Sequence, residues 1–424
     1  MSYAPLRILV VLPMYGGSLP IGRYCARALT DMGHTVRIFE SPLLHSAFTG
    51  LRNLGLPPTQ TAQLENSFLQ VVSQAIWAQV QMQEPQLVLA AAQAPLGHSL
   101  LQRLRRTGIR TAMWFVEDHE IFTYWKAYAP LYDVFAVIQK EPFLSKLAAT
   151  GQKNAFYLPL AALPEFHRPL SLTPQEQREY GADIGFLGAG YPNRRIAFRR
   201  FIGRDFKIWG SDWEGDTQLA SHVQRSGVRI SAEESVKIYN ATRINLNLHS
   251  SLHTTELVSN GDFVNPRTFE LAAIGAFQLV DQRSLMPELF TPNEMATFHT
   301  LEELFAAIEH FLANPEERQA IAERARARVL REHTYVARMA SLLSFIEECF
   351  GPWPQEQQDK EELPEELAPQ LRNELAEVIN NLGLGPHAGF EEVITALRAR
   401  SGVLTEVEAA LLFLDEWRKQ YHKK

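Results

Sequence analysis

The chain has 424 residues, of which 46% are hydrophobic and 21% charged, and its formal net charge is -7. This length exceeds what one hydrophobic core usually serves, so two or three domains are expected, and the acidic balance excludes the basic face of a typical nucleic-acid-binding protein. The two cysteines, Cys25 and Cys349, lie too far apart for a zinc ribbon or a thioredoxin-type site and indicate a reducing, cytoplasmic environment. No apolar run reaches the ~20 residues that a transmembrane helix needs.

The first part of the chain alternates short apolar runs with helical patterns. Strands are predicted at residues 6–13, 35–40, 87–92, 110–116, 134–138 and 155–158, and helices at 21–32 and 62–83. Unbroken apolar strands that alternate with helices are typical of a parallel sheet covered on both faces. Residues 1–160 are therefore predicted to form one Rossmann-like, doubly wound α/β domain.

Four prolines between residues 159 and 174 then interrupt a stretch without clear periodicity, which predicts an interdomain linker at residues 161–180. The alternation restarts over residues 181–334, with strands at 183–187, 206–209, 244–248 and 277–280. Ser231 is the predicted cap of a helix at 232–240, and Pro266 suits the first position of another. A long helix at 335–350 follows, so two tandem doubly wound units are predicted, with the natural ligand site between them.

The end of the chain has a different composition. Residues 351–366 are acidic and read as a solvated linker. Three amphipathic helices are predicted at 367–381, 390–399 and 405–421. No residue pattern there suggests chemistry, so this extension is predicted to be a small docking or self-association module.

The segment at residues 244–280 is the most informative part of the sequence. Its first strand ends in Asn247 and His249, and a polar loop then leads through Asn265, a candidate donor-binding residue, to the start of a helix. A cation in a first helical turn is unfavourable, so Arg267 suggests that an anion such as a diphosphate binds there. Glu270, one turn further, could accept both hydroxyl groups of a ribose. The alternative is a capped surface helix with an Arg–Glu pair three residues apart.

Two runs in this region, NPRTFELAAIGAFQLV and NPEERQAIAERARARVLREHTY, resemble the C-terminal domain of CgeB-type (spore maturation protein) glycosyltransferases. That group is similar to the retaining family 4 of GT-B enzymes. The resemblance covers residues 183–350 well and the first half only in its strand–helix layout. It implies a GT-B glycosyltransferase that binds a nucleotide-diphosphate sugar on residues 181–334 and an acceptor glycan, protein or small molecule on residues 1–160.

The resemblance also implies roles for particular residues. It places Glu270 on the donor ribose and Arg267 beside the diphosphate. Family 4 enzymes carry a further carboxylate eight positions before this glutamate, where this chain has Asp262, a shorter side chain. Transfer is expected to retain the anomeric configuration and to need neither a metal nor another cofactor.

Other donor-site candidates lie in the runs DIGFLGAGYPNRR and KIWGSDW. Gly188 ends a strand and would let a ligand approach the backbone, while Arg194 and Arg195 open the next helix. Related enzymes place a basic residue there against the donor phosphates, although solvated surface arginines would have the same pattern. Trp209 could flank the nucleotide base or lie in the core.

The first half offers weaker candidates. Gly16 and Gly17 follow the first strand and form either an acceptor or phosphate loop or a plain turn, since their spacing does not match the dinucleotide-binding fingerprint. Asp118, in the run WFVEDH, could act as a general base for an acceptor hydroxyl or cap a loop, and His98 is a weaker candidate.

His249 has two interpretations, a hydrogen-bond donor to the sugar or phosphate and a buried structural histidine. A metal site at His249, His253 and Glu256 is not expected, because they lie in a loop without a known metal-binding spacing. Two further functions stay open: a nucleotide-sugar epimerase of the same architecture, and a non-catalytic nucleotide-sugar-binding scaffold.

Overall fold

The computed structural model describes residues 5–252, 254–258, 261–353, 368–384, 388, 390–400 and 402–421. The chain divides into two compact units, Met1–Gly351 and Pro352–Lys424. Most of the predicted acidic linker, from residue 354 onward, lies outside the described residues. No helix within the described ranges is long and apolar enough to cross a membrane.

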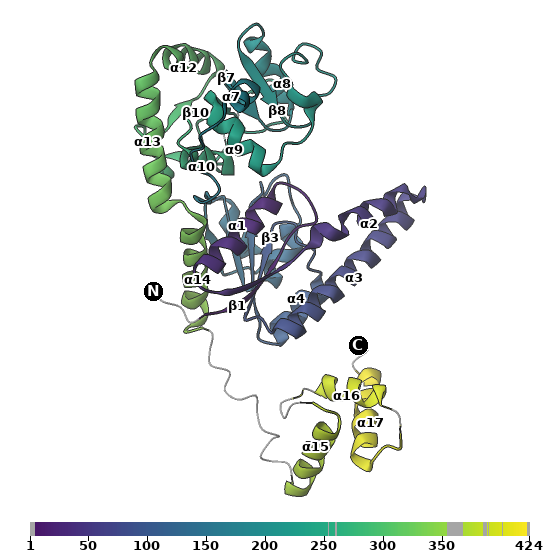
Figure 1. Cartoon of the computed structure of the whole chain (residues 1–424). Helices are drawn as coiled ribbons and strands as arrows, with labels where there is room; N and C mark the ends of the chain where they lie inside the picture. The colour runs from purple at the N-terminus through teal and green to yellow at the C-terminus, as the bar shows by residue number, and fades with distance from the viewer. Residues whose placement is uncertain are drawn as a thin grey trace. The chain divides into compact units, whose positions relative to one another are not determined.

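The first sheet of the large unit has six parallel strands in the order β2-β1-β3-β4-β5-β6 (Figure 1). The strand order reverses between β1 and β3, as in a doubly wound fold. The predicted strands are confirmed to within two residues at each end. They are β1 (Arg7–Val11), β2 (Thr35–Phe39), β3 (Leu87–Ala91), β4 (Arg110–Phe115), β5 (Val134–Val137) and β6 (Ala155–Tyr157).

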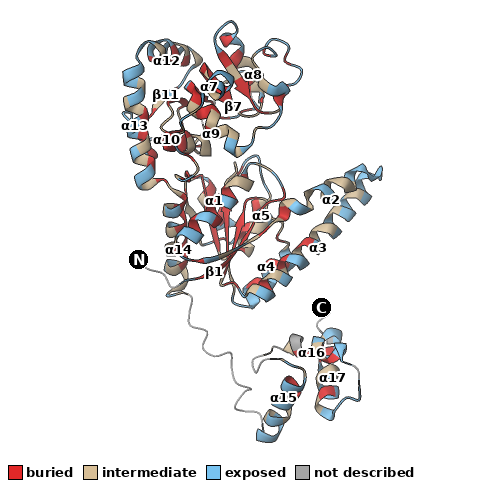
Figure 2. Cartoon of the chain, in the orientation of Figure 1, coloured by how far each residue is buried: buried red, intermediate tan, exposed pale blue. Residues whose placement is uncertain are grey.

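Helices cover this sheet, and their apolar faces supply much of its core. The main ones are α1 (Ser18–Asp31), α2 (His45–Gly50), α3 (Pro58–Gln83), α4 (His98–Arg106) and α6 (Phe143–Ala149). Figure 1 shows α2 and α3 side by side, extending beyond the sheet. Figure 2 shows that the strands are buried, whereas much of α3 is exposed.

The second sheet has five parallel strands in the order β11-β10-β9-β7-β8, which reverses between β7 and β9. Its strands are β7 (Ala182–Leu187), β8 (Phe206–Trp209), β9 (Thr242–Asn247), β10 (Gln278–Asp281) and β11 (Ala296–Phe298), of which only β11 was not predicted. The helices include α8 (Pro192–Phe198), α9 (Ala232–Ala241), α10 (Pro266–Ile274), α12 (Leu301–Ala313) and α13 (Pro315–Glu332). Ser231 caps α9 as predicted, because its side chain accepts the Glu234 N–H.

The region predicted to be an irregular linker contains a helix, α7 (Pro174–Tyr180). Thr173 and Glu176 form a reciprocal capping box at its start. The proline that suggested a break is the first residue of the helix, where its missing N–H costs nothing.

The last helix of the large unit, α14 (Tyr335–Phe350), returns to the first sheet. Tyr335 is fully buried, with its ring centroid 5.3 Å from that of Tyr24 and 6.0 Å from that of Trp114. Arg338 donates hydrogen bonds to the carbonyl groups of Pro159 and Leu160. The helix that follows the second sheet therefore completes the core of the first.

The small unit consists of α15 (Pro369–Asn381), α16 (Phe390–Ala399) and α17 (Glu406–Tyr421), which confirms three predicted helices. The carboxylate of Asp415 is buried and forms ion pairs with Arg398 and Lys419. The small apolar core of this unit consists of Val378, Ile379, Val393, Ile394 and Leu397.

Replacing Tyr335 with alanine should lower the free energy of unfolding by about 3–5 kcal/mol, because it leaves a cavity between α14, α1 and the first sheet. Val336→Ala on the same helix is the matched control, since Val336 is 39% exposed, and it should change stability by less than about 0.5 kcal/mol. Urea unfolding of both variants measures this, and equal stability would show that α14 is not essential to the core.

Candidate functional site

The N-terminus of α10 lies at the carboxyl end of β9 and is held from two sides. The Asn265 side chain accepts the Thr268 N–H at 3.1 Å, which caps the helix. Asn265 Nδ2 donates to Asn247 Oδ1 at 2.7 Å, and the Asn265 backbone N–H donates to His249 Nε2 at 3.0 Å. Asn265, predicted to contact the donor, therefore positions the first turn of the helix.

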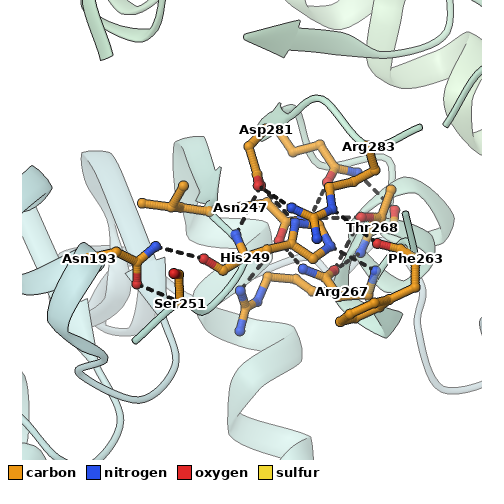
Figure 3. A network of polar contacts seen from close by, with 12 residues as sticks. Asn193, Asn247, His249, Ser251, Phe263, Arg267, Thr268, Asp281 and Arg283 are labelled. Carbon is orange, nitrogen blue, oxygen red and sulfur yellow. Dashed lines mark hydrogen bonds and ion pairs between the residues drawn. The ribbon is translucent and has the colours of Figure 1, made fainter. Parts of the chain in front are cut away.

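His249 lies in the centre of a buried polar network (Figure 3). Its Nδ1 is 2.7 Å from Asp281 Oδ1, and its Nε2 accepts the Asn265 N–H, so the ring is neutral with its proton on Nδ1. Burial lowers the pKa of His249 to about 4. Neither ring nitrogen is available to a substrate in this arrangement, so the geometry does not support the predicted donation to sugar or phosphate and favours the structural alternative.

Asp281 ends β10 and is completely buried. Besides its bonds to His249, it forms an ion pair with Arg283, with Nη1 3.2 Å from Oδ2. Burial by itself raises the pKa of Asp281, but His249 and Arg283 hold that pKa below its ordinary value. The carboxylate therefore stays ionised and fixes the tautomer of His249.

Arg194 and Arg195 bind backbone carbonyl groups rather than facing an open site. Arg194 is 6% exposed and donates to Leu248 O at 2.8 and 2.9 Å and to Ala189 O at 3.0 Å. Arg195 donates to the carbonyl groups of Gly190, Asp212 and Glu214. This geometry gives them a different role from the predicted phosphate contact, because they tie together the loops after β7, β8 and β9.

Arg267 lies beside the end of β7. A Cβ atom on Gly188 would be only 2.9 Å from Arg267 Nη2, so the absence of a side chain at Gly188 leaves room for the guanidinium in this position. Its two hydrogen bonds are long, 3.3 Å from Nε to Tyr239 Oη and 3.4 Å from Nη1 to Asn247 Oδ1. No carboxylate oxygen among the described residues lies within 4.0 Å of the guanidinium, so the group can still bind an anion.

A second cation, the buried Arg194, strengthens the positive potential beside Arg267. Burial, and then the charge of Arg267, lower the pKa of the Arg194 guanidinium to about 9. Two guanidinium groups and the N-terminus of α10 therefore meet at the carboxyl ends of β7 and β9, where the strand order reverses. Such a position favours negatively charged ligands.

Glu270 lies one turn further along α10, with its side chain 19% exposed. No hydrogen-bond donor in the described part of the chain contacts its carboxylate, and the Nε2 atom of His167 is 3.9 Å away. Burial raises the pKa of Glu270 to about 7, although the charge of Arg267 opposes this shift. A partly buried carboxylate without donors is poised to accept hydroxyl groups from a ligand.

The carboxyl ends of the two sheets contact each other. Gln139, which follows β5, donates from Nε2 to Asp262 Oδ1 at 2.9 Å, and its Oε1 accepts the backbone N–H of His119 at 2.9 Å. Lys140 Nζ is 2.5 Å from Glu288 Oε2, in a second contact between the halves. Asp262, the predicted shorter counterpart of a family 4 carboxylate, therefore faces both halves of the large unit.

The site residues predicted in the first half, Gly16, Gly17 and Asp118, lie after the carboxyl ends of β1 and β4. Gly16 has a φ of +104°, with no atom within 4 Å of a Cβ built on it, and its carbonyl accepts a 3.4 Å hydrogen bond from Arg229 Nη2. Gly17 precedes α1. Asp118 is partly exposed and accepts the Glu120 N–H at 2.9 Å, so it caps its own loop and stays a predicted base.

Trp209 is a core residue, which favours the second of its two interpretations over a contact with a nucleotide base. It is 2% exposed and packs against Tyr180, with ring centroids 5.7 Å apart. Within the described ranges, no three His, Cys, Asp or Glu side chains are grouped to hold a metal ion. His253 lies outside those ranges.

Sequence reasoning missed four buried residues that organise the site: Asn193, Gln139, Asp281 and Arg283. Asn193 has no exposed surface and donates to His249 O at 2.9 Å. Gln139 and Asp281 each stand at the carboxyl end of an apolar strand, in FAVIQ and FQLVD. A polar residue at that end of a parallel strand was the available signal.

Three comparisons bear on this arrangement. A family model described as "Glycosyl transferase-like" matches residues 194–344. The spore protein CgeB of Bacillus subtilis (strain 168) is 24% identical over 250 residues, which cover 56% of this chain and 76% of that protein.

Solved structures share the fold. A sucrose-phosphate synthase from Thermosynechococcus elongatus has a TM-score of 0.53 at 14% identity, covering 82% of this chain and 99% of the other. Anabaena HepE, solved in complex with UDP-glucose, also has a TM-score of 0.53, at 12% identity, and covers 81% of this chain and all (100%) of its own.

Glu270 should make stability depend on pH. Its pKa in the folded protein is raised from 4.5 to about 7, so the folded state binds the proton more tightly than the unfolded state. The free energy of unfolding should therefore fall as the pH rises between these values and stay lower above pH ~7. Glu270→Gln should be about 1–3 kcal/mol more stable than wild type at pH ~8 and nearly equal at pH ~4.5. Unfolding curves at both pH values test this, and a pH-independent difference would contradict it.

Proposed function

We propose that this chain, a GT-B glycosyltransferase of the CgeB type, takes its sugar from a nucleotide-diphosphate donor bound at the N-terminus of α10. The observation that carries the proposal is the pairing of Arg267 and Glu270. Arg267 has N–H groups beyond those in its two long hydrogen bonds, at a positive helix end, and Glu270, one turn away, accepts no hydrogen bond from any described residue. A pyrophosphate and the two hydroxyls of a ribose would satisfy both.

The structural relative solved with UDP-glucose supports a nucleotide-sugar ligand on this fold, so we use UDP-glucose as the first probe. The sugar of such a donor would extend toward Asp262, where the two halves of the large unit touch. Gly188 would leave room for the phosphates beside Arg267.

We propose that transfer retains the anomeric configuration and needs no metal. The bond between the anomeric carbon and the phosphate oxygen breaks while the anomeric carbon bonds to the acceptor oxygen. The departing diphosphate takes the acceptor proton, and Arg267 together with the N–H groups of α10 stabilises its charge. Arg194 adds positive potential without touching the ligand.

The acceptor would bind on the first half, near Gly16, Gly17 and Asp118. Asp118 is the alternative proton acceptor, since its carboxylate follows β4 at the edge that faces the second half. Asp118→Asn separates the two routes. A rate within about threefold of wild type supports proton transfer to the phosphate, whereas a loss of 10²–10⁴-fold would assign general-base catalysis to Asp118.

Glu270→Ala should weaken UDP-glucose and uridine binding by at least about tenfold, because the ribose loses its acceptor. Isothermal titration calorimetry measures both affinities. Glu302→Ala is the control, since the Glu302 side chain is 76% exposed and pairs with Arg200 at the surface. If the folded Glu270 variant binds both ligands with unchanged affinity, Glu270 does not bind the ribose.

Arg267→Met should act on the phosphates alone. Affinity for UDP should fall by about 10–100-fold, because a charge-assisted contact is lost, while affinity for uridine stays within about twofold. Equal losses for UDP and uridine would show that Arg267 shapes the site rather than binding the diphosphate.

Turnover distinguishes the remaining functions. Conversion of a nucleotide sugar to its isomer without any acceptor would identify an epimerase. Saturable binding without hydrolysis, isomerisation or transfer to any acceptor pool would identify a nucleotide-sugar-binding scaffold. A thermal-shift screen against a panel of nucleotide sugars selects the donor first, since a ligand at ~100 times its Kd should add ~2.7 kcal/mol of stability.

A further inference from the structure

Helix α3 carries two apolar stripes, only one of which is buried. The inner stripe consists of Val72, Ile76 and Val80, which pack into the core of the first sheet and are at most 2% exposed. The second stripe recurs at alternating spacings of four and three residues. It consists of Leu64, Phe68, Val71, Ala75, Ala78 and Met82.

The second stripe is narrow, and all of its residues except Phe68 are exposed. At 3.6 residues per turn its six side chains fall within an arc of about 80°, and the inner stripe is centred about 120° away. Leu64 is 38% exposed, Val71 is 61% and Met82 is 76%. Phe68 is partly buried, with its ring centroid 5.8 Å from that of Phe48 on α2.

The scarcity of charged residues on α3 indicates what kind of surface could bind its second stripe. Among its 26 residues only Glu65 is charged, and Glu65 is paired with Arg52 at 2.6 Å. A solvent-facing helix normally carries charged residues on its outer side, whereas here the stripe is flanked by uncharged side chains, Gln63, Ser67, Gln70, Gln74 and Gln81. Because α3 itself carries no Lys or Arg and the neighbouring Arg52 is paired with Glu65, this side does not suit an anionic membrane or a nucleic acid. A neutral apolar partner fits it better.

The stripe is complementary to itself when a second copy runs in the opposite direction. Every stripe residue has a mate at the same distance on the other side of position 73. Across a twofold axis at that position, the bulky Phe68 and Val71 would each lie opposite an alanine, Ala78 and Ala75. At the two ends of the contact, Leu64 would lie opposite Met82. A parallel pair would instead place alanine against alanine and phenylalanine against phenylalanine.

We propose that α3 is a self-association surface through which two copies of this chain pair as antiparallel helices across a twofold axis. Small residues near the centre, Ala75 and Ala78, let the helices approach closely, because the distance between two helix axes depends on the side chains at the contact. A contact made by one helix per subunit is at the small end of specific interfaces, so the dimer dissociates on dilution. The surface lies on the predicted acceptor half, outside the proposed donor site.

The test is sedimentation equilibrium of the full chain over a concentration series. Val71→Glu should weaken dimerisation at least tenfold, because it brings a charge into the centre of the apolar contact. Phe413→Glu is the matched control, since Phe413 is a 68%-exposed apolar residue on α17, and it should leave the dimer unchanged. Circular dichroism and thermal unfolding establish that both variants fold.

A charge pair tests the direction of the helices. Combining Val71→Glu with Ala75→Lys in one chain should restore dimerisation to within about threefold of wild type, because each glutamate then faces the lysine of the other copy. In a parallel pair the same double variant would place like charges together and stay monomeric.

Cross-linking provides an independent readout. In a Cys349→Ser background, where Cys25 is buried, the double variant Leu64→Cys, Met82→Cys should form disulfide-linked dimers, and Leu64→Cys alone should not. A wild-type chain that is monomeric at every concentration would overturn the proposal. So would a dimer that Phe413→Glu dissociates and Val71→Glu does not, or one that Leu64→Cys alone cross-links.

Discussion

The hydrogen bond from the Asn265 backbone N–H to His249 Nε2 determines how the site is built. It forms because Asp281 holds the proton of the imidazole on Nδ1, which leaves Nε2 as an acceptor. The N-terminus of α10 is thereby fixed to the end of β9, and the directions of Arg267 and Glu270 follow from helical geometry. A protonated His249 would have no acceptor for this N–H, which is why burial and a neutral ring matter here.

The polar side chains of the site fall into two groups, those with hydrogen-bond partners inside the protein and those with unused hydrogen-bonding capacity. Asn193, Asn247, His249 and Asp281 are buried, and their side chains all make hydrogen bonds. Arg267 and Glu270, in contrast, retain unused hydrogen-bonding capacity while partly withdrawn from water. Such groups lower stability until a ligand satisfies them, so their position on a rigid framework is typical of a binding site.

The two halves of the large unit are joined by more than the connecting chain. Helix α14 packs into the core of the first sheet, and Arg338 fixes it to the carbonyl groups of Pro159 and Leu160 at the end of the first half. At the facing sheet edges, Gln139 is oriented by the His119 backbone and so presents its amide to Asp262. These contacts connect the proposed donor half to the proposed acceptor half.

The two parallel sheets, most helix positions and the capped start of α10 can be predicted from the sequence, because periodicity, capping residues and strand-end polarity are local properties. The sequence also singled out Arg267 and Glu270, whose pattern within one helical turn is local. Tertiary structure alone decided that Arg194, Trp209 and His249 are engaged internally, since their partners come from elsewhere in the chain: Leu248, Tyr180 and Asp281. Likewise, periodicity cannot tell which of two apolar stripes on α3 is buried, because only packing against the first sheet makes that choice.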